Sequence, residues 1–203
     1  DEVAYFGDDF WVVLNKGVSK FVRSFLVKLN FRFLRTPTIF QRLAGRGRTA
    51  TCLNYLWFRG DVKHTLNPPW WLRLVPGLTG SDRIHGPDIL VLGDLLTSRL
   101  PRSGARLRSP GGLFHRMGFD DCSTGALLRQ IAERREMTDF TLAYFPDNDF
   151  QSHHDGPREA ISVVQAVDRL FGDLFEIFGS AEKMLDEWAI VITGDHSQSD
   201  LVD

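Results

Sequence analysis

The chain has 203 residues, of which 43% are hydrophobic, and a formal net charge of −2 at pH 7. A chain of this length and composition can bury a substantial core, and we expect one domain over residues 1–203. The small net charge gives no overall attraction to nucleic acid or to an anionic membrane, so neither is an expected partner. The sequence contains no apolar run long enough to form a transmembrane segment.

The two cysteines, Cys52 and Cys122, leave the redox compartment open. Cys52 lies in an apolar run, which favours a buried thiol over half of a disulfide.

The first part of the chain predicts two helices and a strand. Residues 18–29 carry an apolar stripe at helical spacing, with lysine and arginine on the other face. This pattern favours a surface helix packed on the core over a membrane-binding helix. A second helix is predicted over residues 37–44, where a threonine beside Pro37 can cap its start. Residues 49–58 then predict a strand.

The middle of the chain is rich in turn-forming residues. Residues 65–87 contain many prolines, glycines and tryptophans, which predicts a loop insertion folded over the sheet edge. Residues 88–100 are expected to form a helix because their leucines and isoleucine recur at helical spacing. A further helix is predicted over residues 122–135, capped by Asp120 or Asp121.

The last third of the chain has the pattern of two buried strands joined by a helix. The apolar and β-branched runs at residues 140–145 and 188–193 predict strands of a parallel sheet. Between them, residues 157–178 predict an amphipathic helix that opens on Pro157 and stops at Gly179. The sequence therefore predicts an α/β fold.

Asp and His residues follow each of these two predicted strands. Asp149 and His153 come after the first strand, and Asp195 and His196 come after the second. Parallel strands of an α/β sheet deliver the loops at their carboxyl ends to one crevice, so we expect the four side chains to converge. Mixed carboxylate and imidazole ligands suit Zn²⁺, Mn²⁺ or Fe better than Ca²⁺. The sequence therefore predicts a divalent metal site.

These motifs resemble the type I phosphodiesterase/nucleotide pyrophosphatase family, which belongs to the alkaline phosphatase superfamily. The resemblance rests on Asp149-x-x-x-His153-x-x-Gly156-Pro157, on the strand ending in Asp195-His196, and on the upstream segments 36–43 and 47–52. It implies an alkaline-phosphatase-like, mostly parallel sheet flanked by helices. The chain resembles the middle of a family member with both ends missing, so we expect a partial domain.

The resemblance also implies an activity, the hydrolysis of phosphodiester or pyrophosphate bonds through a Thr or Ser phospho-enzyme. Two divalent metal ions are implied, with Zn²⁺ favoured over Mn²⁺: Asp149 and His153 would hold one, and Asp195 and His196 the other. The implied substrate is a small phosphate ester or nucleotide-like molecule. The nucleophile and other catalytic residues are not identified, and the resemblance makes a secreted or periplasmic parent protein plausible.

Two alternatives stay open on the sequence. The first is a phosphomonoesterase, or a sulfate- or phosphonate-ester hydrolase, of the same superfamily. The second is a non-catalytic module that keeps the α/β fold and binds metal or a partner. The residues that would decide between these functions cannot be picked out by spacing alone.

Overall fold

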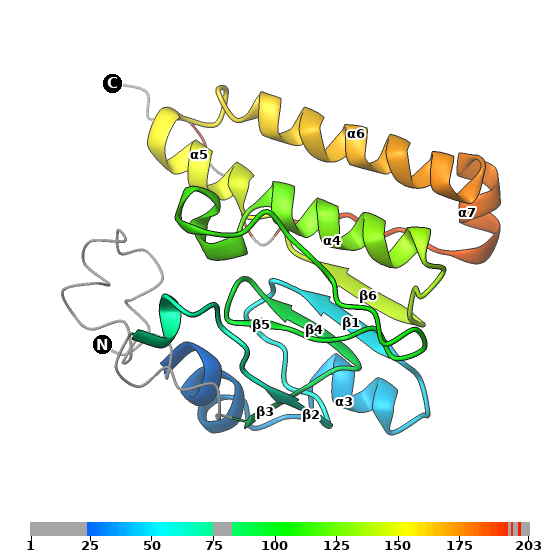
Figure 1. Cartoon of the computed structure of the whole chain (residues 1–203). Helices are drawn as coiled ribbons and strands as arrows, with labels where there is room; N and C mark the ends of the chain where they lie inside the picture. Colours follow the sequence, from blue (N-terminus) through cyan, green and yellow to red (C-terminus); the bar gives the residue numbers. More distant parts are fainter. Residues whose placement is uncertain (1–23, 75–82, 195, 197–198, 200–203) are drawn as a thin grey trace.

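The computed structural model describes residues 24–74, 83–194, 196 and 199, and the elements form three layers (Figure 1). Helices α4 (Asp121–Glu133), α6 (Ile161–Phe178) and α7 (Ala181–Glu187) lie on one face of a sheet. Helix α3 (Ile39–Ala44) and the π-helical η1 (Ser24–Phe33) lie on the other face. This arrangement confirms the predicted α/β class.

The main sheet has four strands in the order β5-β4-β1-β6. The strands are β1 (Ala50–Leu53), β4 (Ile89–Leu92), β5 (Leu96–Thr97) and β6 (Phe140–Ala143). β1 is central and pairs in parallel with β4 and β6, whereas β5 runs antiparallel to β4. A separate antiparallel pair is formed by β2 (Val62–Thr65) and β3 (Arg83–Gly86).

Successive residues of the central strands point to opposite faces of the sheet, as the pleat requires. Cys52 and Leu90 pack with Phe40 on the α3 side. Leu53 and Val91 instead belong to the cluster on the α4 and α6 side. That cluster is built from fully buried or nearly buried helix residues: Leu127, Leu128, Ile131, Leu170, Leu174 and Phe178. The sheet is therefore covered on both faces, which is typical of parallel sheets.

Three helix boundaries follow from local chemistry. Thr38 caps α3: its side chain accepts a hydrogen bond from the Gln41 amide, and the Gln41 side-chain oxygen accepts one from the Thr38 amide. Asp120 caps α4 through the Ser123 amide, and Gly179 ends α6 in the left-handed region at φ 96°. All three boundaries were predicted from the sequence.

Three predicted elements are corrected by the structure. The helix predicted over residues 88–100 is wrong, because these residues form β4 and β5. The strand predicted over residues 49–58 ends at Leu53, where Asn54 turns the backbone at φ 62°. The strand predicted over residues 188–193 is also wrong: this segment has no regular structure, and Val191 and Ile192 are 85% and 79% exposed.

The segment expected to be a loop insertion, residues 65–87, carries secondary structure of its own. A short 3-10 helix, η2, spans Leu72–Leu74, and strand β3 closes the segment. Residues 75–82 lie outside the described residues. Across the described parts of the chain, no helix has both the length and the apolarity needed to cross a membrane.

Candidate metal centre

The candidate site lies where the parallel strands end. Helix α5 (Asp147–Asp155) begins just after β6. The turns after β1 and β4 are tied together there by Asn54, whose side chain accepts a hydrogen bond from the Gly93 amide and donates one to the Gly118 carbonyl. The carboxyl ends of β1, β4 and β6 therefore form one rim, the ligand-binding edge of an α/β sheet.

Three of the four predicted ligands meet at this rim. Asp149 and His153 are one turn apart on α5, and His153 Nε2 lies 3.4 Å from Asp149 Oδ1. His196 arrives from the last segment of the chain, and its Nε2 lies 3.5 Å from the same oxygen. Asp149 Oδ1 is thus shared by two imidazoles from distant parts of the sequence.

The fourth predicted ligand, Asp195, lies outside the described residues. The three described side chains are open to solvent: those of Asp149, His153 and His196 are 43%, 63% and 53% exposed. Among the described residues, no group of three or more His, Cys, Asp or Glu side chains is arranged to hold a metal ion. Both imidazoles contact the Asp149 carboxylate.

The neighbouring histidine has a different environment. His154 lies 3.1 Å, through Nδ1, from the Phe150 carbonyl oxygen, and its ring stacks on Phe150 with the centroids 4.4 Å apart. It therefore belongs to the surface of α5, whereas His153 faces Asp149. This agrees with the sequence-based choice of His153 over His154 as a candidate ligand.

Sequence analysis missed a cluster of charged residues at the same rim. The 3-10 segment η3 (Leu113–Gly118) carries Arg116, whose guanidinium pairs with the Asp147 carboxylate at the start of α5. His115 Nδ1 lies 2.7 Å from Oδ2 of Asp120, the cap of α4. Asp121 completes the cluster beside Asp147. These residues lie at least 26 positions before α5, so no local spacing connects them to it.

Burial shapes the electrostatics of this cluster. It raises the pKa of Asp121 to about 7, and the nearby Asp120 carboxylate adds to the rise while Arg116 opposes it. Asp121 Oδ2 is buried and has no hydrogen-bond partner among the described residues. Burial also lowers the pKa of Arg116, against the raising influence of Asp120 and Asp121. A carboxyl that titrates near neutrality therefore lies close to the candidate metal ligands.

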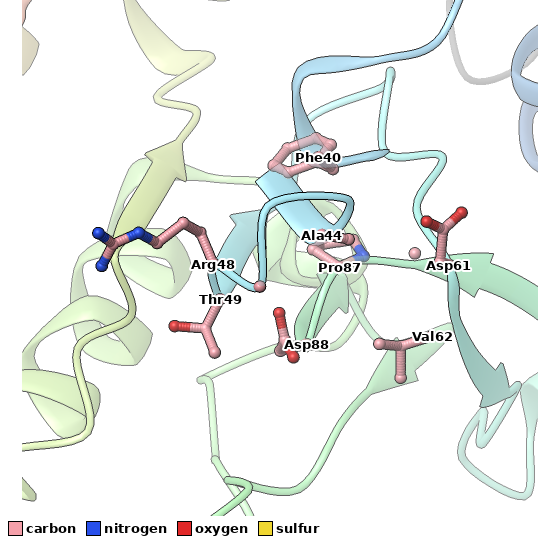
Figure 2. A pocket seen from close by; sticks show the side chains of 10 residues that line it. Phe40, Ala44, Arg48, Thr49, Asp61, Val62, Pro87 and Asp88 are labelled. Carbon is pink, nitrogen blue, oxygen red and sulfur yellow. The ribbon is translucent and has the colours of Figure 1, made fainter. Parts of the chain in front are cut away.

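A separate cavity of about 260 Å³ lies at the other end of the strands (Figure 2). Thr49 and Asp88, which line it, directly precede β1 and β4. Asp88 Oδ2 accepts a hydrogen bond from the Ala50 amide, so this carboxylate already stabilises the start of β1. The amino ends of parallel strands are not the usual ligand edge, and this cavity is distinct from the candidate metal centre.

The sequence model of the family described as type I phosphodiesterase / nucleotide pyrophosphatase matches residues 6–203. The chain belongs to this family. Searches of curated proteins and of solved structures gave no significant match.

Membership confirms the sequence-based assignment and agrees with the observed fold, a mixed sheet of mainly parallel strands flanked by helices. The family consists of hydrolytic enzymes that act on small phosphate esters, and it is generally dependent on divalent metal ions.

Proposed function

We propose that the protein is a metal-dependent hydrolase of phosphodiester or pyrophosphate bonds, with Asp149, His153, Asp195 and His196 as metal ligands. The observation that carries the proposal is the approach of two imidazole nitrogens to one oxygen of Asp149. Exposed Asp-His contacts of this kind contribute little to stability, which favours a functional reason for their convergence.

The distances between these atoms fit the donor set of a metal ion. Two ligand atoms bound at about 2.0–2.1 Å to one tetrahedral Zn²⁺ lie about 3.4 Å apart. The separation of 3.4 Å between Asp149 Oδ1 and His153 Nε2, the two ligands proposed for one ion, is of that size. The residues present therefore fit a divalent cation, and Zn²⁺ or Mn²⁺ suits their mixed oxygen and nitrogen donors. We extend the proposal to two ions: Asp149 and His153 would hold the first, and Asp195 and His196 the second. The contact between His196 and Asp149 places the two ligand pairs beside each other.

The proposed ligands define what this chain contributes to the reaction. The ions, when bound, supply positive charge that stabilises the attacking and leaving oxygens of a phosphoryl group. Asp149 and His153 hold their donors on one face of a helix, so a small phosphate ester can reach them from solvent. A Thr or Ser is expected to carry the phosphoryl group transiently, and we assign that role to no particular residue.

The test compares Asp149→Asn with Asp155→Asn, a control at the exposed end of the same helix. Zinc affinity is measured by competition with a chromophoric chelator. Hydrolysis is measured with bis(p-nitrophenyl) phosphate, p-nitrophenyl phosphate and p-nitrophenyl sulfate. We expect the wild type and the control to bind zinc and to hydrolyse the diester. In Asp149→Asn, zinc affinity and the rate of hydrolysis should each fall about tenfold to a hundredfold or more.

The same experiment separates the alternatives. A preference for the monoester or the sulfate would replace the diesterase assignment with another hydrolase of the superfamily. Zinc binding that depends on Asp149, without hydrolysis of any ester, would favour a metal-binding module. Equal zinc affinity in the wild type and Asp149→Asn would overturn the proposed ligand set.

A further inference from the structure

The amino ends of α4 and α5 are interlocked. Asp121 and Asp147 are the first residues of these two helices. The Asp121 amide donates to Oδ2 of Asp147 at 3.2 Å, and the Asp147 amide donates to Oδ1 of Asp121 at 3.0 Å. Each carboxylate thus stabilises an amide that has no partner within its own helix. This reciprocal pair fixes the start of α5 relative to α4.

Arg116 joins this pair to the body of α5. Its guanidinium pairs with the Asp147 carboxylate and lies over the Phe150 ring, with the guanidinium carbon 4.5 Å from the ring centroid. Asp147 and Phe150 flank Asp149 in the first turn of α5. A planar cation can make both contacts at once, because it forms directional hydrogen bonds in its plane and stacks through its face. Arg116 therefore contacts α5 on both sides of the candidate ligand Asp149.

The backbone that carries Arg116 is held in an unusual conformation. Arg116 and Met117 have φ values of 43° and 56°, in the left-handed region that side-chain-bearing residues rarely adopt. The turn is anchored to the sheet by the Asp94 amide, which donates to the Met117 carbonyl at 2.7 Å. The Asn54 side-chain amide donates a hydrogen bond of 2.9 Å to the carbonyl oxygen of the next residue, Gly118. The ends of β1 and β4 thus fix the turn that presents Arg116 to α5.

We propose that Arg116 is a positioning residue for the metal centre, holding the first turn of α5, together with Asp121 and Asp147, so that Asp149 faces His196. This inference rests on the proposed function and deepens it. The alignment matters because Asp149 contacts both His153 and His196. A displacement of about 1 Å at a ligand helix can impair a site whose own residues are intact.

The test compares Arg116→Met with Arg129→Met in the full chain. Arg129 forms an ion pair of 3.0 Å with Asp173 and links α4 to α6, so its removal also breaks a partly exposed ion pair of α4. The first measurement is amide hydrogen exchange across α5 in chelator-treated, metal-free protein. The second is zinc affinity by chelator competition. Arg116→Met is expected to raise exchange across α5 and to lower zinc affinity about tenfold to a hundredfold, whereas Arg129→Met leaves both unchanged.

A second variant, Arg116→Lys, guards against a general loss of folding in Arg116→Met. Lysine keeps the positive charge but lacks the planar guanidinium group. Arg116→Lys should therefore have a zinc affinity and an exchange rate across α5 between those of Arg116→Met and the wild type. Exchange across α5 that is the same in Arg116→Met, Arg129→Met and the wild type would overturn the inference. Loss of protection across α5 without any change in zinc affinity would overturn it too.

The two proposals fail in different ways. If the wild type and Asp149→Asn bind zinc equally, the proposed metal ligands are wrong, and so is the role of Arg116 in positioning them. If Asp149→Asn abolishes zinc binding while Arg116→Met leaves α5 protected and zinc affinity intact, the ligands stand and only the positioning role fails.

Discussion

His196 Nε2 and Asp149 Oδ1 lie 3.5 Å apart, although helices α6 and α7 and the irregular residues 188–194 lie between them in the chain. Residues 188–194 follow α7 and form no strand of the sheet. Histidine and aspartate are therefore brought together by the path of the chain around α6 and α7. This long-range contact connects the two motifs on which the family resemblance was based.

Adjacent histidines on α5 allow a matched test of the ligand assignment. Only His153 faces Asp149, since His154 stacks on Phe150. His153→Ala should therefore weaken zinc binding about tenfold to a hundredfold, and His154→Ala should leave it near the wild-type value. Isothermal titration of metal-free protein with zinc measures both. A larger loss in His154→Ala than in His153→Ala would contradict the assignment.

The raised pKa of Asp121 predicts a specific dependence of stability on pH. An aspartate has a pKa near 3.9 when unfolded and Asp121 has a pKa of about 7 when folded, so the folded protein binds this proton more tightly. The contribution of Asp121 to stability is therefore fully present below about pH 4 and is lost as the pH rises towards 7. A substitution of Asp121 alone tests this, because it leaves the neighbouring charged side chains in place: Arg116, Asp120 and Asp147.

Asp121→Asn should remove this dependence, because the amide resembles the protonated carboxyl. We expect the melting temperatures of the variant and the wild type to be close at pH 4.5, and the variant to melt higher at pH 8. Thermal unfolding in chelator-containing buffer, followed by circular dichroism, measures the difference at both values. A variant that melts lower than the wild type at pH 8 would show that the charged carboxylate stabilises the fold.

Asn54 should be one of the most sensitive positions outside the apolar core. Its side chain is fully buried, accepts from the Gly93 amide, and donates to the Gly118 carbonyl and to Thr124 Oγ1. Asn54→Gly keeps the left-handed backbone accessible but leaves these groups without their partner. Unsatisfied buried groups cost about 1–3 kcal/mol each, so we expect a loss of about 2–4 kcal/mol in the free energy of unfolding.

Denaturation with urea measures this loss, and Asn67→Ala is a suitable comparison. Asn67 is half-buried, and its side chain exchanges two hydrogen bonds with the backbone of Thr97, so its removal should cost less. A similar or smaller loss for Asn54→Gly would mean that water replaces the missing side chain at the rim.

Local chemistry explains which elements could be predicted. The capping threonine, the capping aspartate and Gly179 each act within a few residues, so the boundaries of α3, α4 and α6 follow from the sequence. By contrast, Ile89–Leu92 is buried on both faces and lacks the alternation that marks a strand. A short, fully apolar run shows neither the helical nor the strand periodicity, and the leucines that follow this run happen to fall at helical spacing.

The wrong strand prediction for residues 188–193 has a different cause, the pairing between distant segments. Residues 188–193 have strong β propensity, yet a strand requires a neighbouring backbone, and propensity does not reveal whether one is present. For the candidate site, the sequence predicted Asp149, His153 and His196 because each follows an apolar run, and the structure brings these three together. Arg116 was missed because its role depends on a turn fixed by β1 and β4, which no spacing in the sequence shows.

The two cysteines are expected to differ strongly in reactivity. Both thiols are free, but Cys52 is fully buried between the sheet and α3, whereas Cys122 is exposed at the start of α4. Burial raises the pKa of the Cys52 thiol to about 12, against a smaller lowering by a backbone hydrogen bond with Tyr55. Since the thiolate is the reactive form, Cys52 should be inert in the folded protein.

Titration with a chromogenic disulfide reagent at pH 8 measures this difference. We expect one equivalent of thiol to react rapidly in the native protein, and a second to react only after unfolding in guanidinium chloride. Cys122→Ser should abolish the rapid phase and leave the slow one, because the remaining thiol becomes reactive only when the core opens. Two rapid equivalents in the wild type would show that the face of the sheet covered by α3 opens readily, and none after unfolding would show a disulfide.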